Sequence, residues 1–340
     1  MPDLNPDATP LPAPEPAEPK GPSNLRLRVI WGALAAALLI GCTFGGPISF
    51  AVFFAAVQAV ILKEFYRIMR ASGYRPASWI GGIIGVLIFC WVHLLTGFWH
   101  YAQRFDWHLN TTLYPPLSSM QGWIEPMHPV SMPQKVYHLL FGIPGAAHLY
   151  LGLVLSAVLV TALLLREIIC WPNHGQPFPN VAVTLAGLLY VSMPMSLLSS
   201  LAFRGENYRP GYVFLLIFFV WAADTGAYFA GKNFGKHKLA PSISPGKTWE
   251  GWAGGAALTL ATGWAAGYFL PDIPLSHRLV AAGVVAVFGP LGDLAESMLK
   301  RSAGVKDSGT FLPGHGGLLD RFDAFLLVLP VLALLQVLLG

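Results

Sequence analysis

The sequence has little charge and almost no cysteine. Only 11% of its 340 residues are charged, against roughly 25% in soluble domains, whereas 54% are hydrophobic. This balance excludes an ordinary water-soluble domain and favours a protein whose solvent is lipid. The three cysteines, Cys42, Cys90 and Cys170, lie far apart in or beside apolar runs, so neither a disulfide framework nor a CxxC metal site is expected. The formal net charge of +4 does not imply a nucleic-acid partner.

The first residues form a tail with almost nothing to bury. Residues 1–24 are rich in proline, alanine and acidic residues, which predicts a disordered cytoplasmic tail without chemistry. The apolar stretch that follows, ending at Cys42, has the look of a signal peptide. It starts late and further apolar runs follow it, so we interpret it as an uncleaved first helix.

Nine apolar runs are long enough to cross a bilayer, which takes about 17 to 25 residues. They lie near residues 27–44, 47–66, 77–99, 147–167, 181–203, 211–231, 250–270, 279–299 and 320–340. The predicted fold is an all-α integral membrane protein of about nine transmembrane helices. We divide it into an N-terminal transmembrane region, residues 25–180, and a C-terminal catalytic region, residues 181–340.

The basic residues indicate the orientation of these helices. With the N-terminus inside, sixteen of the 21 lysines and arginines fall in cytoplasmic segments and five in outer segments. Cytoplasmic loops of membrane proteins carry such an excess of basic residues. The sequence therefore predicts a cytoplasmic N-terminus.

A long segment near residues 100–146, rich in proline and aromatic residues, falls on the outer side. Its histidines, His100, His108, His128 and His138, lack the short paired spacing of a metal site. We expect an interfacial cap, with an amphipathic or re-entrant piece around 135–147.

Acidic residues inside apolar runs are costly in lipid, so each is a functional candidate. Asp224 lies in the cytoplasmic half of the sixth run, where it either partners a basic residue or serves a site. In the eighth run, Asp293, Glu296, Ser297 and Lys300 are spaced to share one helical face. A simple Glu296–Lys300 helix pair would explain part of this face, but Asp293 lies deeper than such a pair needs.

A glycine-rich loop leads into the last run. The segment PGHGG, residues 313–317, permits close backbone approach, and a helix N-terminus after it suits a phosphate. Asp320 and Asp323 lie on one side of that helix and are within reach of a divalent cation. Either aspartate alone is explained by ordinary capping of the helix N-terminus. Capping explains the two together less well, because Asp293 is expected to face them. His315 is either a proton carrier, a phosphate ligand or a turn residue without a role.

A basic segment, residues 230–251, lies between the sixth and seventh runs. Its lysines and glycines suit a triphosphate or an anionic headgroup, although plain positive-inside topology also explains them. The tetrapeptide PGKT, residues 245–248, is not a P-loop, because the required glycine is replaced by Pro241 and no strand precedes it. Taken together, carboxylates, amines and glycine loops at one face predict metal-dependent phosphoryl-type transfer.

The stretch SMLKRSAGVKDSGTFLPGHGGLLDRFD, residues 297–323, closely resembles the signature of the phosphatidate cytidylyltransferases, or CDP-diacylglycerol synthases. GDLAES, ADTGAYFAGKNFGKHKL and ISPGKTWEG resemble that family too, so the likeness covers roughly residues 180–340. The first half resembles it only in being helical and membrane-spanning. The resemblance implies a nine-helix membrane enzyme that is often dimeric. The distribution of basic residues predicts that its active site faces the cytoplasm, and we expect it in the bacterial inner membrane. The resemblance also implies condensation of CTP with phosphatidic acid to CDP-diacylglycerol and pyrophosphate, with Mg²⁺ required and a second cation as an open alternative.

The same resemblance implies roles for individual residues. The implied metal ligands are Asp293 and Asp320, followed by Asp323 and Asp224. The implied catalytic residues are Ser297, Lys300, Arg301, Lys306, Asp307, His315 and Arg321. The implied substrate-binding residues are Lys232, Lys236, Ser244, Lys247, Thr248, Glu250, Gly316 and Gly317.

Three other functions compete with this one. A CTP-dependent lipid kinase of the dolichol-kinase type is similar in architecture but lacks the matched signature. A cation-coupled transporter also keeps acidic residues in its helices, yet here they gather at one face and no inverted repeat is evident. A CDP-alcohol phosphotransferase requires a D-G-x-x-A-R pattern that the sequence lacks.

Overall fold

The computed structural model describes residues 24–104, 145–204, 207–311 and 316–339, most of which are helical. The predicted tail, most of the predicted outer segment and His315 lie outside these ranges. The N-terminal helices are α1 (Asn24–Phe44), α2 (Pro47–Ala71), α3 (Ser78–Thr96), α4 (Phe98–Arg104) and α6 (Gly145–Cys170). Helix α1 therefore begins at the last residue assigned to the tail.

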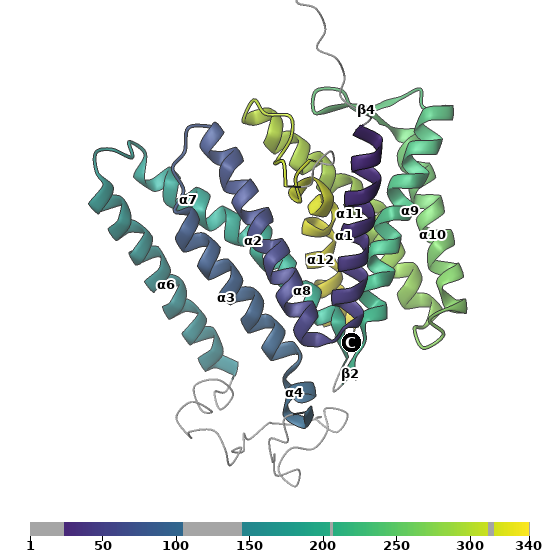
Figure 1. Ribbon diagram of the computed structural model, residues 1–340, viewed down its shortest axis with the longest axis horizontal. Helices are drawn as coiled ribbons and strands as arrows, with labels where there is room; N and C mark the ends of the chain where they lie inside the picture. Colours follow the sequence, from purple (N-terminus) through teal and green to yellow (C-terminus); the bar gives the residue numbers. More distant parts are fainter. Residues whose placement is uncertain (1–23, 105–144, 205–206, 312–315, 340) are drawn as a thin grey trace, which may run out of the picture.

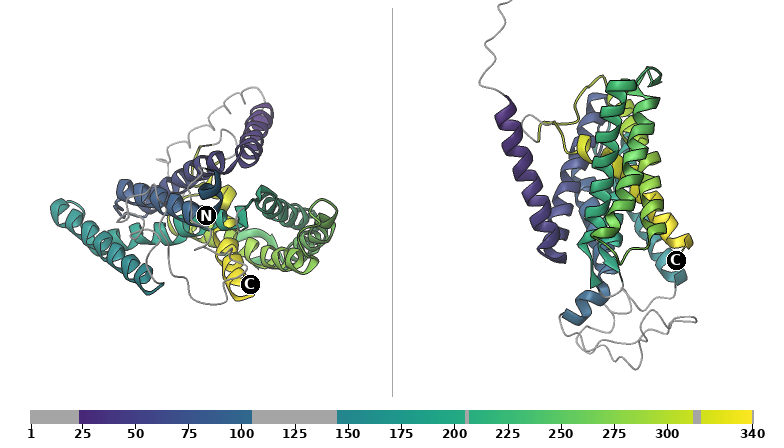
Figure 2. Two further views of the ribbon diagram at one scale, coloured as in Figure 1. Left: turned by 90° about the horizontal axis from the view of Figure 1, so that it is seen from below. Right: turned by 90° about the vertical axis from the view of Figure 1, so that its right-hand side faces the viewer.

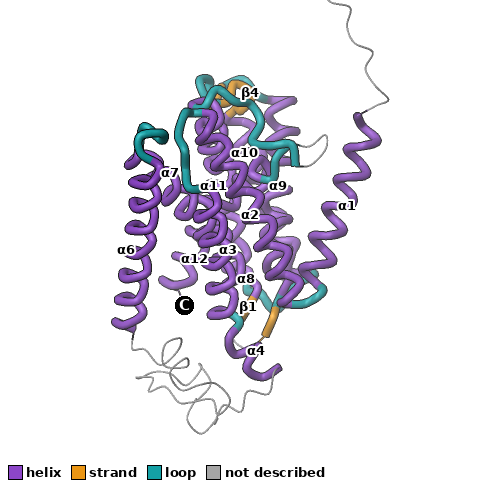
Figure 3. Tube along the Cα trace, turned by 60° about the vertical axis from the view of Figure 1, so that its left-hand side comes forward, coloured by secondary structure: helices purple, strands orange, loops and turns teal. Residues whose placement is uncertain are grey.

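The C-terminal half contains most of the bundle. Its helices are α7 (Pro177–Gly187), a π-helical turn (Leu188–Ser192), α8 (Met193–Ala202), α9 (Pro210–Phe234), α10 (Trp249–Ala265), a 3-10 turn (Ala266–Tyr268), α11 (Leu275–Ser302) and α12 (Leu319–Leu339). Two antiparallel hairpins complete it: β1 (Phe203–Arg204) with β2 (Asn207–Tyr208), and β3 (Lys238–Ala240) with β4 (Ser244–Thr248). The hairpins lie at opposite ends of the bundle (Figure 3).

Each of the nine apolar runs coincides with a helical stretch, which supports the all-α prediction. Among the described residues, six helical stretches are long and apolar enough to cross a membrane: Pro47–Ala71, Ser78–Thr96, Gly152–Cys170, Pro177–Ala202, Pro210–Phe234 and Leu275–Ser302. The chain is therefore an integral membrane protein. The count of nine spans and the cytoplasmic N-terminus remain predictions.

The helices run side by side, with α6 at one edge and α10 at the other (Figure 1). Helix α8 lies inside the bundle and contacts α3, α9 and α12. Helix α1 lies at the periphery and diverges from the bundle along its length (Figure 2). Its apolar side chains, such as Val29 and Leu38, are largely exposed, as expected for side chains that face lipid.

The backbones of helices α9 and α10 approach each other closely. A Cβ atom added at Gly226 would lie 2.6 Å from the carbonyl oxygen of Gly254, and one at Gly255 would lie 2.7 Å from that of Ala223. Small residues permit such contact in membranes, where packing rather than the hydrophobic effect joins helices. This contact fixes the two helices that carry the β3–β4 hairpin.

Helix α11 contains Pro290, which has no amide hydrogen to donate to the carbonyl of Ala286. The indole Nε1 of Trp252, on α10, donates to that oxygen at 2.7 Å. A side chain of the neighbouring helix therefore satisfies the acceptor that the proline leaves open. The same bond fixes α10 against α11.

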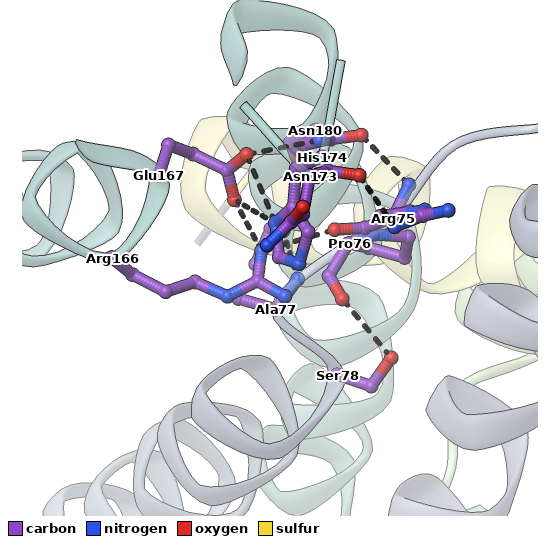
Figure 4. A network of polar contacts seen from close by, with 10 residues as sticks. Arg75, Pro76, Ala77, Ser78, Arg166, Glu167, Asn173, His174 and Asn180 are labelled. Carbon is purple, nitrogen blue, oxygen red and sulfur yellow. Dashed lines mark hydrogen bonds and ion pairs between the residues drawn. The ribbon is translucent and has the colours of Figure 1, made fainter. Parts of the chain in front are cut away.

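A polar cluster joins the N-terminal helices at the end of the bundle where α2 ends (Figure 4). Glu167, only 3% exposed, accepts hydrogen bonds from Arg166 and from Asn180 Nδ2, the latter at 2.9 Å. The Oδ1 atom of Asn180 accepts from the backbone amide of Arg75 at 2.7 Å. The cluster therefore ties the α6–α7 connection to the α2–α3 connection.

The contact between α9 and α10 leads to a stability prediction. Gly226→Leu forces the two backbones apart, so we expect a loss of roughly 1 to 3 kcal/mol or more in the free energy of unfolding. Gly283→Leu is the matched control, because a Cβ atom at Gly283 meets no atom within 4 Å. The unfolding midpoint of each variant in detergent micelles measures the difference, and equal midpoints would contradict the packing account.

Candidate active site

The candidate site lies at the end of the bundle that carries the β3–β4 hairpin (Figure 1). Three side chains there form what we call the acidic cluster: Asp293 and Glu296 of α11, and Asp323 of α12. Their ligand oxygens all lie within 4.8 Å of one another. The predicted face of α11 is confirmed, because Ser297 Oγ donates to Asp293 Oδ1 at 3.3 Å and Lys300 pairs with Glu296.

Gly292 brings α11 and α12 together beside this cluster. A Cβ atom at Gly292 would lie 2.5 Å from the carbonyl oxygen of Asp323 and 2.9 Å from Cα of Ala324. No larger residue fits without moving a backbone. Carboxylates from two helices therefore meet because the residue preceding Asp293 has no side chain.

Lys300 links the acidic cluster to the start of α12. Its Nζ atom lies 2.8 Å from Glu296 Oε2 and 2.7 Å from Asp320 Oδ1. The other oxygen of Asp320 accepts hydrogen bonds from the backbone amides of Gly317 at 3.0 Å and Ser308 at 3.3 Å. Asp320 thus joins Ser308, before the glycine-rich loop, to Gly317, at its end. The Glu296–Lys300 pair exists, but it belongs to this larger network.

Lys247 reaches the acidic cluster from β4. Its Nζ atom lies 2.5 Å from Asp293 Oδ2 and donates to the carbonyl oxygen of Pro290 at 3.3 Å. The ammonium group therefore stands directly beside a candidate metal ligand. Of the substrate-binding residues predicted on the basic segment, Lys247 alone makes a described polar contact with the cluster.

Two of the predicted substrate-binding residues shape the hairpin instead. Thr248 is the N-cap of α10, and its Oγ1 accepts from the amide of Gly251 at 3.1 Å. Glu250 lies 2.5 Å from His237 Nδ1 and accepts from the backbone amides of Lys236 and His237. These bonds fix the hairpin over α10 and so determine where Lys247 points.

Several other predicted residues lie around the acidic cluster. Lys232, Lys236, Arg301, Lys306, Asp307 and Arg321 are exposed and surround the site with charge. Asp224 is also exposed and interacts electrostatically with Asp293, Lys247 and Arg321. Ser244 is half-buried on β4. Gly316 has a φ of +86°, a conformation that favours glycine, and it precedes Gly317 at the Asp320 cap.

Sequence reasoning missed Glu64, which is only 5% exposed on α2. Its Oε2 accepts from the amide of Leu319 at 2.8 Å and from Ser308 Oγ at 3.3 Å, so it holds the loop and the start of α12. Glu64 lies in the second apolar run, so the rule that an acidic residue in such a run is a candidate functional residue includes it as well. Glu167, at the end of the fourth apolar run, is buried as well.

The donor set of the acidic cluster fits a hard divalent cation. All three donors are carboxylates, the ligands that Mg²⁺ prefers. Glu296 is 1% exposed and its Oε1 has no hydrogen-bond partner among the described residues, although an unpaired carboxylate oxygen is costly to bury. Lys247 supplies part of the positive charge that the cluster requires. The arrangement is suited to neutralising phosphate oxygens through a cation, with lysines beside it.

Comparison with known proteins agrees with this chemistry. A sequence model described as the Cytidylyltransferase family matches residues 26–339. The chain is 32% identical over 311 residues to a phosphatidate cytidylyltransferase of Bacillus subtilis (strain 168), covering 91% of this chain and 96% of that protein. It is 39% identical over 186 residues to the phosphatidate cytidylyltransferase of Staphylococcus saprophyticus, covering 54% of this chain and 70% of that protein. A third relative of that name, from Staphylococcus aureus (strain COL), is 45% identical over 161 residues, which is 47% of this chain and 60% of the relative. From the match over almost its whole length, the chain belongs to the cytidylyltransferase family.

Proposed function

We propose that the acidic cluster and the lysines around it form the active site of a phosphatidate cytidylyltransferase. The chain condenses CTP with phosphatidic acid to give CDP-diacylglycerol and pyrophosphate, the activity that the names of its relatives state. The observation that supports this site best is the meeting of Asp293, Glu296 and Asp323 beside Lys247 and Lys300. A nucleotide and a lipid phosphate require positively charged groups, and a metal cation requires carboxylates. The site brings both kinds of group to one place.

The reaction forms one phosphorus–oxygen bond and breaks another. A phosphate oxygen of phosphatidic acid attacks the α-phosphorus of CTP, and the bond from that phosphorus to the bridging oxygen breaks, so that pyrophosphate leaves. Lys247 exchanges Asp293 for a phosphate oxygen of the substrate. Lys300 keeps Asp320 and Glu296 in place.

Mg²⁺ is the proposed cofactor, held by Asp293, Glu296 and Asp323, with Asp224 close by. When bound, it would neutralise charge on the phosphate oxygens and orient them. Asp320 remains a predicted ligand, although its oxygens are occupied by Lys300 and two amides in this structure. A second cation also remains a proposal.

We place the site on the cytoplasmic side of the bacterial inner membrane. At the hairpin end of the bundle lie the basic residues of the α2 terminus, the β3–β4 hairpin and the glycine-rich loop, such as Lys63, Lys236 and Lys306. At the opposite end the described basic residues are few, and Arg204, Arg209 and Arg278 are among them. This distribution supports a cytoplasmic hairpin end. A homodimer also remains a proposal.

Purified protein with labelled CTP, phosphatidic acid and Mg²⁺ tests the reaction. We expect labelled CDP-diacylglycerol and one pyrophosphate per turnover, with no product when the cation is removed by a chelator. A lipid alcohol serves as the competing acceptor. Phosphorylated lipid and CDP from that acceptor, without CDP-diacylglycerol, would indicate a lipid kinase instead.

Removing single carboxylates tests the cation site. We expect Asp293→Asn, Asp323→Asn and Asp320→Asn each to lower turnover by roughly a hundredfold or more, because the cation contributes several kcal/mol of charge stabilisation. The first two also shift the Mg²⁺ dependence to higher concentration, because they lose a ligand. Asp272→Asn, at the opposite end of the bundle, is the control. Near-normal turnover in the variant of Asp293, Asp323 or Asp320 would remove that aspartate from the proposed site.

Glu64 acts as a positioning residue for the loop. Glu64→Ala leaves the amide of Leu319 without its charged acceptor, so we expect kcat to fall roughly tenfold to a hundredfold, with a smaller change in KM. Glu64→Gln keeps one acceptor oxygen and restores part of kcat. Lys63→Ala, an exposed neighbour, is the control. If both Glu64 variants lose stability in step with activity, the role is structural only.

A further inference from the structure

A cavity of about 390 Å³ lies at the end of the bundle opposite the acidic cluster. It is formed where α8 ends, α9 and α11 begin and α12 ends. Its walls are largely apolar, with Leu215, Phe219, Ala281 and Leu335 among them. Its volume lies in the range of small-ligand sites, which is about 300 to 1,000 Å³. Neither the proposed reaction nor the family match assigns it a ligand.

Arg278 of α11 lines this cavity and is only 9% exposed. Its Nε and Nη1 atoms are buried without a hydrogen-bond partner among the described residues. The guanidinium lies against Gly267, where an added Cβ atom would overlap it. A buried, unpaired arginine is costly, and in membrane proteins such a group marks a site for a partner of opposite charge.

The mouth of the cavity adds further basic groups. Arg204 lies there, with Nη1 donating to the hydroxyl of Tyr212 at 2.9 Å, and His277 lies nearby. No described residue that lines the cavity is acidic. The neighbouring carboxylate, Asp272, pairs with Arg209 at 3.1 Å. Within the described chain, the positive charge of Arg278 therefore has no carboxylate partner.

Exposed aromatic residues place this end of the bundle at the surface of the bilayer. Trp264, Tyr268 and Phe269 follow one another at the end of α10 and are 58%, 75% and 86% exposed. Aromatic side chains gather at the level of the lipid headgroups. An arginine-lined cavity at that level faces phosphate groups on one side and acyl chains on the other.

We propose that this cavity binds an anionic phospholipid. The phosphodiester accepts hydrogen bonds from Arg278 and Arg204, and the first part of one acyl chain occupies the apolar wall. Arginine suits phosphate because its fork of donors matches two oxygens at once. A free phosphate ion shares the charge but cannot fill the apolar wall, and a zwitterionic lipid brings a cation towards Arg204. The site is separate from the proposed reaction and does not depend on it.

Binding of phosphatidylglycerol to the purified full chain tests this site, because that lipid lacks the terminal phosphate of the proposed substrate. Native mass spectrometry of the chain in neutral detergent gives apparent dissociation constants for phosphatidylglycerol, phosphatidylcholine and inorganic phosphate. We expect phosphatidylglycerol to bind most tightly. Arg278→Gln weakens it by about tenfold or more through the loss of charged hydrogen bonds.

Three further variants keep the test decisive. Arg278→Lys retains the charge and most of the binding, which covers the case in which Arg278→Gln does not fold. Leu335→Trp fills the cavity and lowers binding with the arginine intact. Arg209→Gln, an exposed arginine at the same end, binds as the parent chain does.

Two outcomes overturn the proposal. Equal binding of phosphatidylglycerol by the parent chain, Arg278→Gln and Leu335→Trp would remove the lipid from this cavity. Inorganic phosphate that binds as tightly as phosphatidylglycerol would make it a simple anion site. Turnover of CTP and phosphatidic acid in phosphatidylcholine micelles stays within about twofold in Arg278→Gln, so failure of this proposal is distinguishable from failure of the active site.

Discussion

Mutual repulsion among carboxylates is the constraint on which the candidate active-site end of this protein depends. Asp293, Glu296 and Asp323 are held together in a partly buried place, where like charges repel each other more strongly than in water. Lys300 and Lys247 offset part of that repulsion, one from the same helix and one from the hairpin. The close contact at Gly292 holds α11 against α12, so the two helices do not separate under the remaining repulsion. The proposed cation would complete the neutralisation.

Each neighbouring element fixes one part of this arrangement. The glycine contacts between α9 and α10 set the base of the hairpin, and Glu250 holds the hairpin down so that Lys247 reaches Asp293. Trp252 donates to the carbonyl oxygen that the proline of α11 leaves without a donor, roughly one to two turns before Asp293. The site therefore depends on ordinary helix packing several residues away from the chemistry.

Sequence patterns predicted the parts of this site that one helix carries. The spacing of Asp293, Glu296, Ser297 and Lys300 fixed their common face, because helical periodicity is a local property. Contacts between helices have no such periodicity. The pairing of Lys300 with Asp320, the reach of Lys247 and the hairpin role of Glu250 became visible only in three dimensions. Glu64 lies 255 positions from Leu319, and no local pattern links two residues so far apart.

The contact between Glu64 and the start of α12 bears on how the two halves of the chain are related. The residues that resemble the family signature all lie after residue 180, yet the loop among them closes on a carboxylate from α2. The first half is thus a wall of the site as well as a membrane scaffold. A substitution at Glu64 therefore reaches the start of α12 directly, although the two segments lie in different halves of the chain.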